Sequence, residues 1–355
     1  MHLRSFALDL ATSLETANGP IDRREGFLVG IDAEGEDAPV PGVGEATPLP
    51  GWTESLSACE SALREHRTAR NRDELTDAVT DIDPAVNPAA RHGLALALTD
   101  ANARGEGRSL SARLAAEHGL SAPAGSVPVN ATIGDGSPAA TAREAERAVV
   151  KGFDCIKLKV GVRDLSSDID RLRSVRERVG DGVALRADAN GAWDRETAAR
   201  ALDRLEPLEL AYVEQPLPAG DVAGTAALRG ETSVRIALDE SLAAHGIDAV
   251  LDAGAADVVV LKPMALGGPG RALAAALRAR AAGVEPVVTT TVDAVIARTA
   301  AVHVAAAIPD VIPCGLATGP LLASDLAADP SPVEDGQISV PAGPGLAGDA
   351  FDGVW

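Results

Sequence analysis

Short apolar runs rich in valine and isoleucine alternate with alanine-rich segments of helical length from about residue 126 onward. The longer segments carry apolar residues at intervals of three and four and have glycine near their ends, as amphipathic helices do. The apolar runs predict eight strands, at residues 126–133, 154–160, 183–190, 210–216, 234–240, 257–263, 285–291 and 311–317. Eight strands, each followed by a helix, predict an α/β fold of the (β/α)8 TIM-barrel type. An open doubly wound sheet is the alternative, but no glycine-rich phosphate fingerprint follows the first strand.

The first 120 residues do not show this alternation. Residues 27–35 and 42–49 predict antiparallel strands joined by turns rich in glycine and aspartate, and helices follow, notably at residues 87–105. We therefore expect an N-terminal α+β capping domain over residues 1–120 and a barrel domain over residues 121–322. The tail, residues 323–355, has one more strand-like piece and is expected to return to the cap and complete it.

The composition gives the chain an acidic surface and a core with few aromatic residues. Hydrophobic residues make up 46% of the chain but aromatic ones only 2%, so alanine, valine and leucine must build the core. The net charge is −20, from 52 acidic and 32 basic residues, which disfavours binding to nucleic acid and to anionic membranes. Arginine in place of lysine on such a surface is typical of a halophilic protein, because salt screens the repulsion between like charges. An acidic protein from a GC-rich genome is the alternative.

Cysteine usage and the N-terminus indicate a cytoplasmic protein. The three cysteines, Cys59, Cys155 and Cys314, are odd in number and lack metal-type spacing, so reduced thiols are expected. Asp9 interrupts the apolar run at the N-terminus, which is therefore not a signal peptide. No window approaches 18 uncharged apolar residues, so no transmembrane helix is expected.

Polar side chains end five successive predicted strands, about one strand–helix unit apart. In chain order they are Lys157 and Lys159, Asp188 and Asn190, Glu214, Asp239 and Glu240, and Lys262. The carboxyl ends of barrel strands converge on one mouth, where the active sites of this fold lie. Three carboxylates there suit a hard divalent cation such as Mg²⁺. The six histidines are scattered and are interpreted as structural or surface residues rather than zinc ligands.

Lysine is rare in this chain, and its placement indicates acid–base chemistry. Only four of the 32 basic residues are lysines, and two of them, Lys157 and Lys159, lie on the same face of one predicted strand. Lys262 enters the mouth from a strand four positions away. A second ammonium and a nearby dication lower the pKa of a lysine that acts as a base, whereas arginine does not deprotonate. This set suits removal of a proton α to a carboxylate, with the resulting enediolate stabilised by the cation. A solvated strand end is the alternative for the lysine pair.

Over essentially its whole length the chain resembles the muconate-lactonizing subgroup of the enolase superfamily. The motifs that carry the resemblance are "KLK" (157–159), "DAN" (188–190), "VEQP" (213–216), "LDES" (238–241) and "LKP" (261–263). The resemblance implies that Asp188, Glu214 and Asp239 bind Mg²⁺, for which Mn²⁺ can substitute. It also implies that Lys159 is the base on one face of the substrate and Lys262 the lysine on the other. Lys157 would tune Lys159 and contact the enediolate.

Two stretches are similar to the o-succinylbenzoate synthases of menaquinone biosynthesis, residues 42–55 and 314–322. The first matches a cap segment of those enzymes and the second the end of their eighth strand. This resemblance implies further residues that contact the substrate or support the ligands: Asn190, Glu240, Thr289, Thr290, Thr291, Gly315 and Thr318. Dipeptide epimerases typically carry a D-x-D at the end of strand eight, where this chain has Gly-Leu-Ala-Thr.

The implied function is that of a lyase acting on a small-molecule carboxylate. It is the syn dehydration of 2-succinyl-6-hydroxy-2,4-cyclohexadiene-1-carboxylate to o-succinylbenzoate. An N-succinylamino acid racemase, or another racemase or cycloisomerase of the subgroup, is the first alternative. A non-catalytic metal-binding protein on the same fold is an alternative of another class. Acidic enzymes of this fold are often dimers or larger, so a homo-oligomer is compatible with the sequence.

Overall fold

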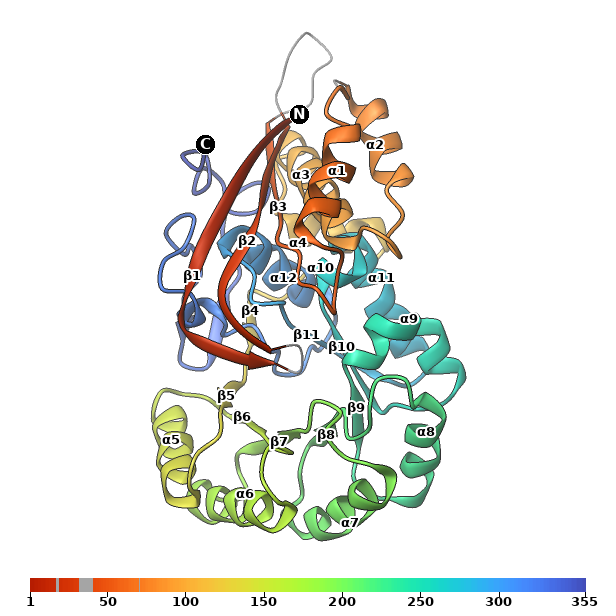
Figure 1. Ribbon diagram of the computed structural model, residues 1–355. Helices are drawn as coiled ribbons and strands as arrows, with labels where there is room; N and C mark the ends of the chain where they lie inside the picture. Colours follow the sequence, from red (N-terminus) through yellow and green to blue (C-terminus); the bar gives the residue numbers. More distant parts are fainter. Residues whose placement is uncertain (17–18, 32–40, 70) are drawn as a thin grey trace.

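The computed structural model describes residues 1–16, 19–31, 41–69 and 71–355. An antiparallel sheet and four helices form a cap above a barrel of parallel strands, and the C-terminal tail runs beside both (Figure 1). This arrangement confirms the predicted fold class, a modified TIM barrel with an N-terminal α+β cap.

The cap is built on a three-stranded antiparallel sheet in the order β1-β2-β3. Its strands are β1 (His2–Thr16), β2 (Gly19–Ile31) and β3 (Gly42–Ala46), and its helices are α1 (Leu56–Glu65), α2 (Arg72–Asp81), α3 (Pro88–Gly105) and α4 (Leu110–Glu117). The antiparallel pair predicted within residues 27–49 is confirmed for β2 and β3, while residues 32–35 lie outside the described residues. The sequence analysis did not predict β1, although Phe6, Leu8 and Leu10 alternate in it as in a strand with one buried face.

Glycines let α3 approach β3 closely. A Cβ on Gly44 would lie 2.0 Å from the carbonyl oxygen of Gly93, and a Cβ on Gly42 would lie 2.3 Å from the carbonyl oxygen of Ala97. Backbone therefore meets backbone between the helix and the sheet, which only residues without a side chain permit.

The barrel contains seven hydrogen-bonded parallel strands in the order β11-β10-β9-β8-β7-β6-β5. They are β5 (Ala131–Ile133), β6 (Cys155–Lys159), β7 (Ala184–Asp188), β8 (Tyr212–Glu214), β9 (Ile236–Leu238), β10 (Val258–Leu261) and β11 (Glu285–Val288). The helices between and after them are α5 (Pro138–Val150), α6 (Leu165–Val179), α7 (Arg195–Leu205), α8 (Val222–Glu231), α9 (Glu240–Asp252), α10 (Pro263–Leu266), α11 (Pro269–Ala281) and α12 (Val295–Ala307).

The eighth predicted strand differs from the expectation. Residues 311–317 form only isolated parallel bridges, Cys314 to Val129 and Gly315 to Thr289, which close the barrel between β11 and β5. The 3-10 turn η2 (Gly319–Leu321) follows it, where a helix was expected. Pro313 has no N–H to donate and Gly315 has no side chain to pack, so a regular ladder cannot extend through this segment.

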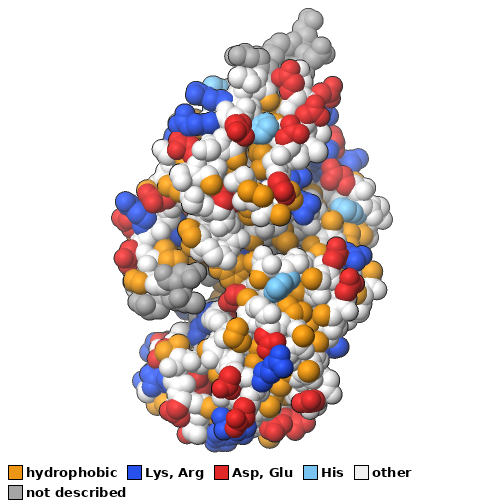
Figure 2. All heavy atoms as spheres, turned by 45° about the vertical axis from the view of Figure 1, so that its right-hand side comes forward, with side chains coloured by type: hydrophobic (Ala, Val, Ile, Leu, Met, Phe, Trp, Pro, Cys, Tyr) orange, Lys and Arg blue, Asp and Glu red, His pale blue; other side chains and the backbone are white. Residues whose placement is uncertain are grey.

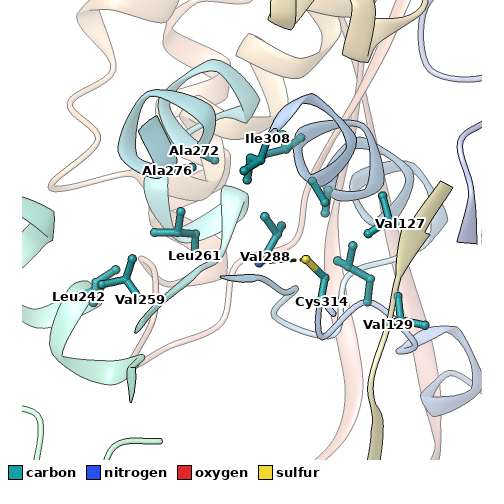
Figure 3. Close-up of a cluster of buried hydrophobic side chains, with 14 of the residues drawn as sticks. Val127, Val129, Leu242, Val259, Leu261, Ala272, Ala276, Val288, Ile308 and Cys314 are labelled. Atoms are coloured by element: carbon teal, nitrogen blue, oxygen red, sulfur yellow. Dashed lines mark hydrogen bonds between the residues drawn. The ribbon is translucent and has the colours of Figure 1, made fainter. Parts of the chain in front are cut away.

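Small apolar side chains fill the space between the strands and the surrounding helices. In the cluster of Figure 3, Leu261 and Val288 of adjacent strands lie near Ala272 and Ala276 of α11, and Cys314 accepts a 3.4 Å hydrogen bond from the N–H of Val288. Burial raises the pKa of the Cys314 thiol to about 11, so this residue packs in the core as expected. All three cysteines are free and buried.

The tail contacts the barrel first and the cap afterwards. β12 (Val333–Glu334) pairs with β13 (Gln337–Ser339), which pairs in turn with β4 (Ser126–Pro128), the short strand that precedes β5 in the chain. Farther on, the N–H of Leu346 donates to Asp100 of α3 at 2.8 Å. These contacts link the tail to both parts, while the expected domain limits at residues 120 and 323 stay predictions.

Charged groups of both signs occupy the two ends of the face shown in Figure 2, and hydrophobic atoms gather across its middle. Surface pairs such as Arg195–Asp221 and Arg229–Asp257 use arginine as the cation. In the part of the chain that the structure describes, no helix has the length and apolarity needed to cross a membrane.

Glu45 joins the cap to the barrel. This fully buried residue of β3 accepts hydrogen bonds from the backbone N–H groups of Ala294 and Ala297, both at 2.8 Å, at the start of α12. The Thr47 hydroxyl also donates to Glu45. Ala294 offers no capping side chain of its own, so a carboxylate from the cap satisfies the free N–H groups of a barrel helix.

We predict that Glu45→Gln destabilises the protein by about 1–3 kcal/mol, because the amide presents a donor to backbone donors and leaves one of them unsatisfied. Thermal unfolding followed by circular dichroism measures the effect. Glu25→Gln, at an exposed position of β2, is the matched control and should leave the midpoint unchanged. Equal midpoints for both variants would contradict the assigned role of Glu45.

Candidate active site

The strand ends at the barrel mouth bring the predicted polar residues together. Lys159 lies opposite Asp188 in the β6–β7 ladder, and Asp188 lies opposite Glu214 in the β7–β8 ladder. Because successive side chains of a strand alternate between faces, Lys157 and Lys159 share a face while Leu158 between them is buried in the core.

Each of the two lysines of β6 contacts carboxylates of neighbouring strands. The ammonium of Lys157 lies 3.0 Å from Oε1 of Glu214 and 3.0 Å from Oδ2 of Asp188. The ammonium of Lys159 donates to Oδ2 of Asp188 at 2.7 Å. Lys159 is 36% exposed and Lys157 only 15%, so Lys159 is the more accessible of the two to a substrate.

Asn190 connects Lys159 to Glu240. Its Oδ1 accepts from the Lys159 ammonium at 2.8 Å, and its Nδ2 donates to Oε1 of Glu240 at 2.9 Å. Oε2 of Glu240 is buried and has no hydrogen-bond partner in the structure. The chain of contacts fixes the direction of the Lys159 side chain and leaves an acceptor available beside it.

Lys262 enters the mouth from the end of β10. Its ammonium donates to both oxygens of Asp239, and it lies 3.2 Å from the centre of the Trp52 ring. Lys262 is buried, and Trp52 comes from the cap. In strand order β10 is four positions from β6, so Lys262 and Lys159 approach the mouth from opposite sides.

Burial and charge change the pKa values of the three carboxylates in different directions. Burial acts to raise the pKa of Asp188, but the Lys157 and Lys159 ammonium groups outweigh it and hold that pKa below its usual range. Burial, together with the charge of Asp188, raises the pKa of Glu214 to about 7. Burial raises the pKa of Asp239 to about 6 despite the neighbouring Lys262. The positive charge around Glu214 and Asp239 is therefore too small to offset the effect of burial on their pKa values.

The carboxylate partners of Lys157 determine the direction of its pKa shift. Burial acts to lower this pKa, but Asp188 and Glu214 outweigh burial and raise it well above its usual value. Lys157 is accordingly held as a cation by its carboxylate partners, which suits an electrostatic role.

Thr289, Thr290 and Thr291 follow the end of β11, and Thr318 follows the strand-eight segment. Thr289 donates to the carbonyl oxygen of Gly315 at 2.7 Å, and the hydroxyls of Thr290 and Thr318 lie 3.1 Å apart. Thr291 donates to the Asp293 carboxylate. These hydrogen bonds hold the β11 and strand-eight ends together beside the mouth, separate from the contacts of the lysine–carboxylate cluster.

Comparison with known proteins shows the family to which this chain belongs. The family model described as "Enolase C-terminal domain-like" matches residues 140–349, more than half of the chain. The chain belongs to the enolase superfamily. The resemblance seen in the sequence is confirmed, and so is the prediction that the protein is an enzyme of this superfamily.

Among curated relatives of this enolase-superfamily chain, an o-succinylbenzoate synthase of Thermobifida fusca is 44% identical over 61% of this chain and 67% of the relative. The chain aligns with only 60% to 67% of the length of three such relatives, two o-succinylbenzoate synthases and an epimerase.

Solved structures cover nearly the whole chain. The L-Ala-D/L-Glu epimerase of Bacillus subtilis superposes with a TM-score of 0.86 at 28% identity, covering 98% of this chain and 97% of the other. A dipeptide epimerase of Enterococcus faecalis, complexed with Mg and a dipeptide, gives 0.84 at 26% identity, with 98% of both chains covered.

The donor set of this superfamily member fits a hard divalent ion in its chemistry. Asp188, Glu214 and Asp239 supply buried carboxylate oxygens from three adjacent strands, and two of these groups have raised pKa values that added positive charge would relieve. Among the described residues, no three Asp, Glu, His or Cys side chains lie close enough together to hold a metal ion, and lysine ammonium groups lie against each of the three carboxylates.

The sequence analysis missed two contacts between the cap and the barrel, those of the buried Arg24 and of the half-buried Trp52. Arg24 of β2 donates to the carbonyl oxygens of Thr47 and Pro48 at 2.8 and 3.2 Å, and it lies near the carboxylate of Asp293. The contact of Trp52 with Lys262 was not predicted either, although its segment was expected to resemble a synthase cap loop. Both contacts join cap and barrel across long stretches of sequence, where no local pattern signals them.

Proposed function

We propose that this protein is an o-succinylbenzoate synthase, a carbon–oxygen lyase that converts 2-succinyl-6-hydroxy-2,4-cyclohexadiene-1-carboxylate to o-succinylbenzoate in menaquinone biosynthesis. The observation that carries the proposal is the pair of lysines on opposite sides of a carboxylate-lined mouth, Lys159 at the end of β6 and Lys262 after β10. Identity of 44% to a relative of that name favours the synthase over other activities of the superfamily.

Asp188, Glu214 and Asp239 are the residues that would hold a divalent ion, and Mg²⁺ suits their oxygen donors. When bound, the ion would supply Lewis-acid stabilisation of negative charge on the substrate carboxylate. The dipeptide epimerase complexed with Mg supports this assignment. Lys157, held charged between Glu214 and Asp188, would add positive charge on the same side.

Lys159 is the proposed base. As a neutral amine it takes the proton from the carbon α to the ring carboxylate, and the electron pair of that C–H bond delocalises into an enediolate. The electron pair then forms the new ring double bond as the C–O bond breaks. The proton on Lys159 passes to the departing hydroxyl on the same face, so that water leaves. Asn190 keeps the Lys159 side chain directed through its hydrogen bond to the amine.

Lys262 would remain a cation over the opposite face and stabilise the anionic intermediate electrostatically. Its burial strengthens that effect, because charge is screened less in a site with little water. Formation of the aromatic ring supplies most of the driving force, so the enzyme need only lower the barrier to deprotonation.

We predict that Lys159→Ala lowers kcat for the dehydration by about 10²–10⁴-fold, the range by which a positioned general base accelerates proton transfer. The assay follows loss of the diene absorbance in molar KCl with Mg²⁺. Lys151→Ala is the matched control, because Lys151 is an exposed lysine outside the mouth. Wild-type turnover by Lys159→Ala would refute the role of Lys159.

We also predict that Mg²⁺ affinity weakens by about tenfold or more between pH 8 and pH 6, because protons compete with the metal for carboxylates. The raised pKa values of Glu214, about 7, and Asp239, about 6, put their protonation in this window. Isothermal titration calorimetry measures the dissociation constant. Glu214→Gln should abolish binding, whereas Glu231→Gln, at an exposed position at the end of α8, should match the wild type. A dissociation constant that does not change with pH would contradict the ligand set.

The second candidate is an N-succinylamino acid racemase, since two lysines on opposite faces of a stereocentre can act as two bases. The similarity to the structure of an epimerase, at 28% identity, supports this second candidate, because an epimerase also inverts a stereocentre. Exchange of the α-hydrogen of an N-acylamino acid with solvent deuterium, together with failure to dehydrate the cyclohexadiene, would favour racemization.

A further inference from the structure

Trp52 of the cap faces the ammonium of Lys262 in the barrel. The charged nitrogen lies 3.2 Å from the ring centre, with the Asp239 carboxylate as its other partner. Aromatic residues make up only 2% of this chain, and one of its three tryptophans meets a lysine of the site here. A cation over the face of an indole is attracted by the ring's negative quadrupole.

The turn that carries Trp52 is held rigidly. The backbone N–H of Trp52 donates to the carbonyl oxygen of Leu49 at 2.9 Å, and the Thr53 hydroxyl accepts from the N–H of Leu49 at 2.7 Å. The next residue, Glu54, accepts from the N–H groups of Ala89 and Ala90 at the start of α3, at 3.0 and 2.8 Å. Trp52 is therefore presented to the barrel by a fixed support on the cap.

Under the proposed function, the Asp239 carboxylate interacts with both the Lys262 ammonium and the divalent ion. A carboxylate that binds a divalent ion holds a neighbouring ammonium less strongly, and the ion itself repels that ammonium. The Trp52 ring attracts the ammonium without supplying a metal ligand, so it can hold Lys262 while Asp239 serves the metal. Besides Asp239, the Trp52 ring is the contact found for the Lys262 ammonium among the described residues.

We propose that Trp52 is a positioning residue that holds the Lys262 ammonium over its side of the barrel mouth when Asp239 binds a divalent metal ion. The inference rests on the proposed metal-assisted function of the same mouth. The cap thereby takes part in the chemistry, because the ring determines where the cation of Lys262 lies relative to the substrate.

The first test is spectroscopic and needs no substrate. Mg²⁺ is titrated into the protein while tryptophan emission is recorded, since the ammonium beside the ring loses its bond to Asp239 when that carboxylate binds the metal. An emission change should occur in the wild type and be lost in Lys262→Met and in Trp52→Phe, with Mg²⁺ binding retained in calorimetry. An emission change that persists in Lys262→Met would overturn the proposal, and so would its absence from a Mg²⁺-saturated wild type.

The second test is kinetic. Trp52→Leu should lower kcat about tenfold with KM within about twofold, as the loss of a cation–π contact in a buried site allows, while Trp52→Phe should recover most of the rate. In a Lys262→Met background, Trp52→Leu should cost nothing further. Trp355→Leu, at the half-exposed C-terminal residue against Gly30, is the matched control and should keep the wild-type rate.

A rise in KM with unchanged kcat would show that the ring binds substrate, and additive losses in the double variant would show a general packing role; either result overturns the positioning role. Circular dichroism of Trp52→Leu confirms that the variant folds. A wild type that lacks synthase activity but keeps the Lys262-dependent emission change would refute the proposed reaction while supporting the role of Trp52.

Discussion

The charge balance at the barrel mouth is the constraint on which the rest of this structure depends. Asp188, Glu214 and Asp239 are almost completely buried, and buried carboxylates are stable only with positive charge close by. Lys157, Lys159 and Lys262 supply it, each hydrogen-bonded to at least one of them. Removing Lys262 would leave Asp239 buried without its ammonium partner, and removing Lys157 would do the same to Glu214, whereas Asp188 contacts two lysines. Lys157 and Lys262 therefore serve folding as well as chemistry.

Contacts between the cap and the barrel contribute to this mouth as well. A cap turn places Trp52 against Lys262 at the mouth, and β3 of the cap sheet presents Glu45 to the first N–H groups of α12. Glu45 satisfies N–H groups that lack a partner within α12, and Trp52 adds a second contact to an ammonium that already bonds to Asp239. Cap and barrel are consequently parts of one site, although the sequence between them contains no hint of either contact.

The sequence predicts well those features that repeat locally. The period of two in β6 places Lys157 and Lys159 on one face, and one strand–helix unit after another brings Asp188, Glu214 and Asp239 to the same end. It predicts poorly what depends on distant partners. Glu45 meets α12 about 250 residues later in the chain. The eighth strand is irregular because Pro313 and Gly315 interrupt its ladder. Only isolated bridges to the two neighbouring strands hold this segment in place.

Choice of substrate must come from the rim, because a synthase and a racemase would use the same lysines. The strand-eight end, Gly315 to Thr318, contains no acidic side chain, and Thr290 and Thr318 meet there through their hydroxyls. The nearby Asp293 accepts from Thr291 and lies close to Arg24, so its charge is already engaged. A rim of neutral hydroxyls offers little to a substrate ammonium but can donate to carbonyl or carboxylate oxygens. That chemistry disfavours a substrate with a free ammonium group, such as a dipeptide, and it is compatible with the substrate of the proposed synthase reaction.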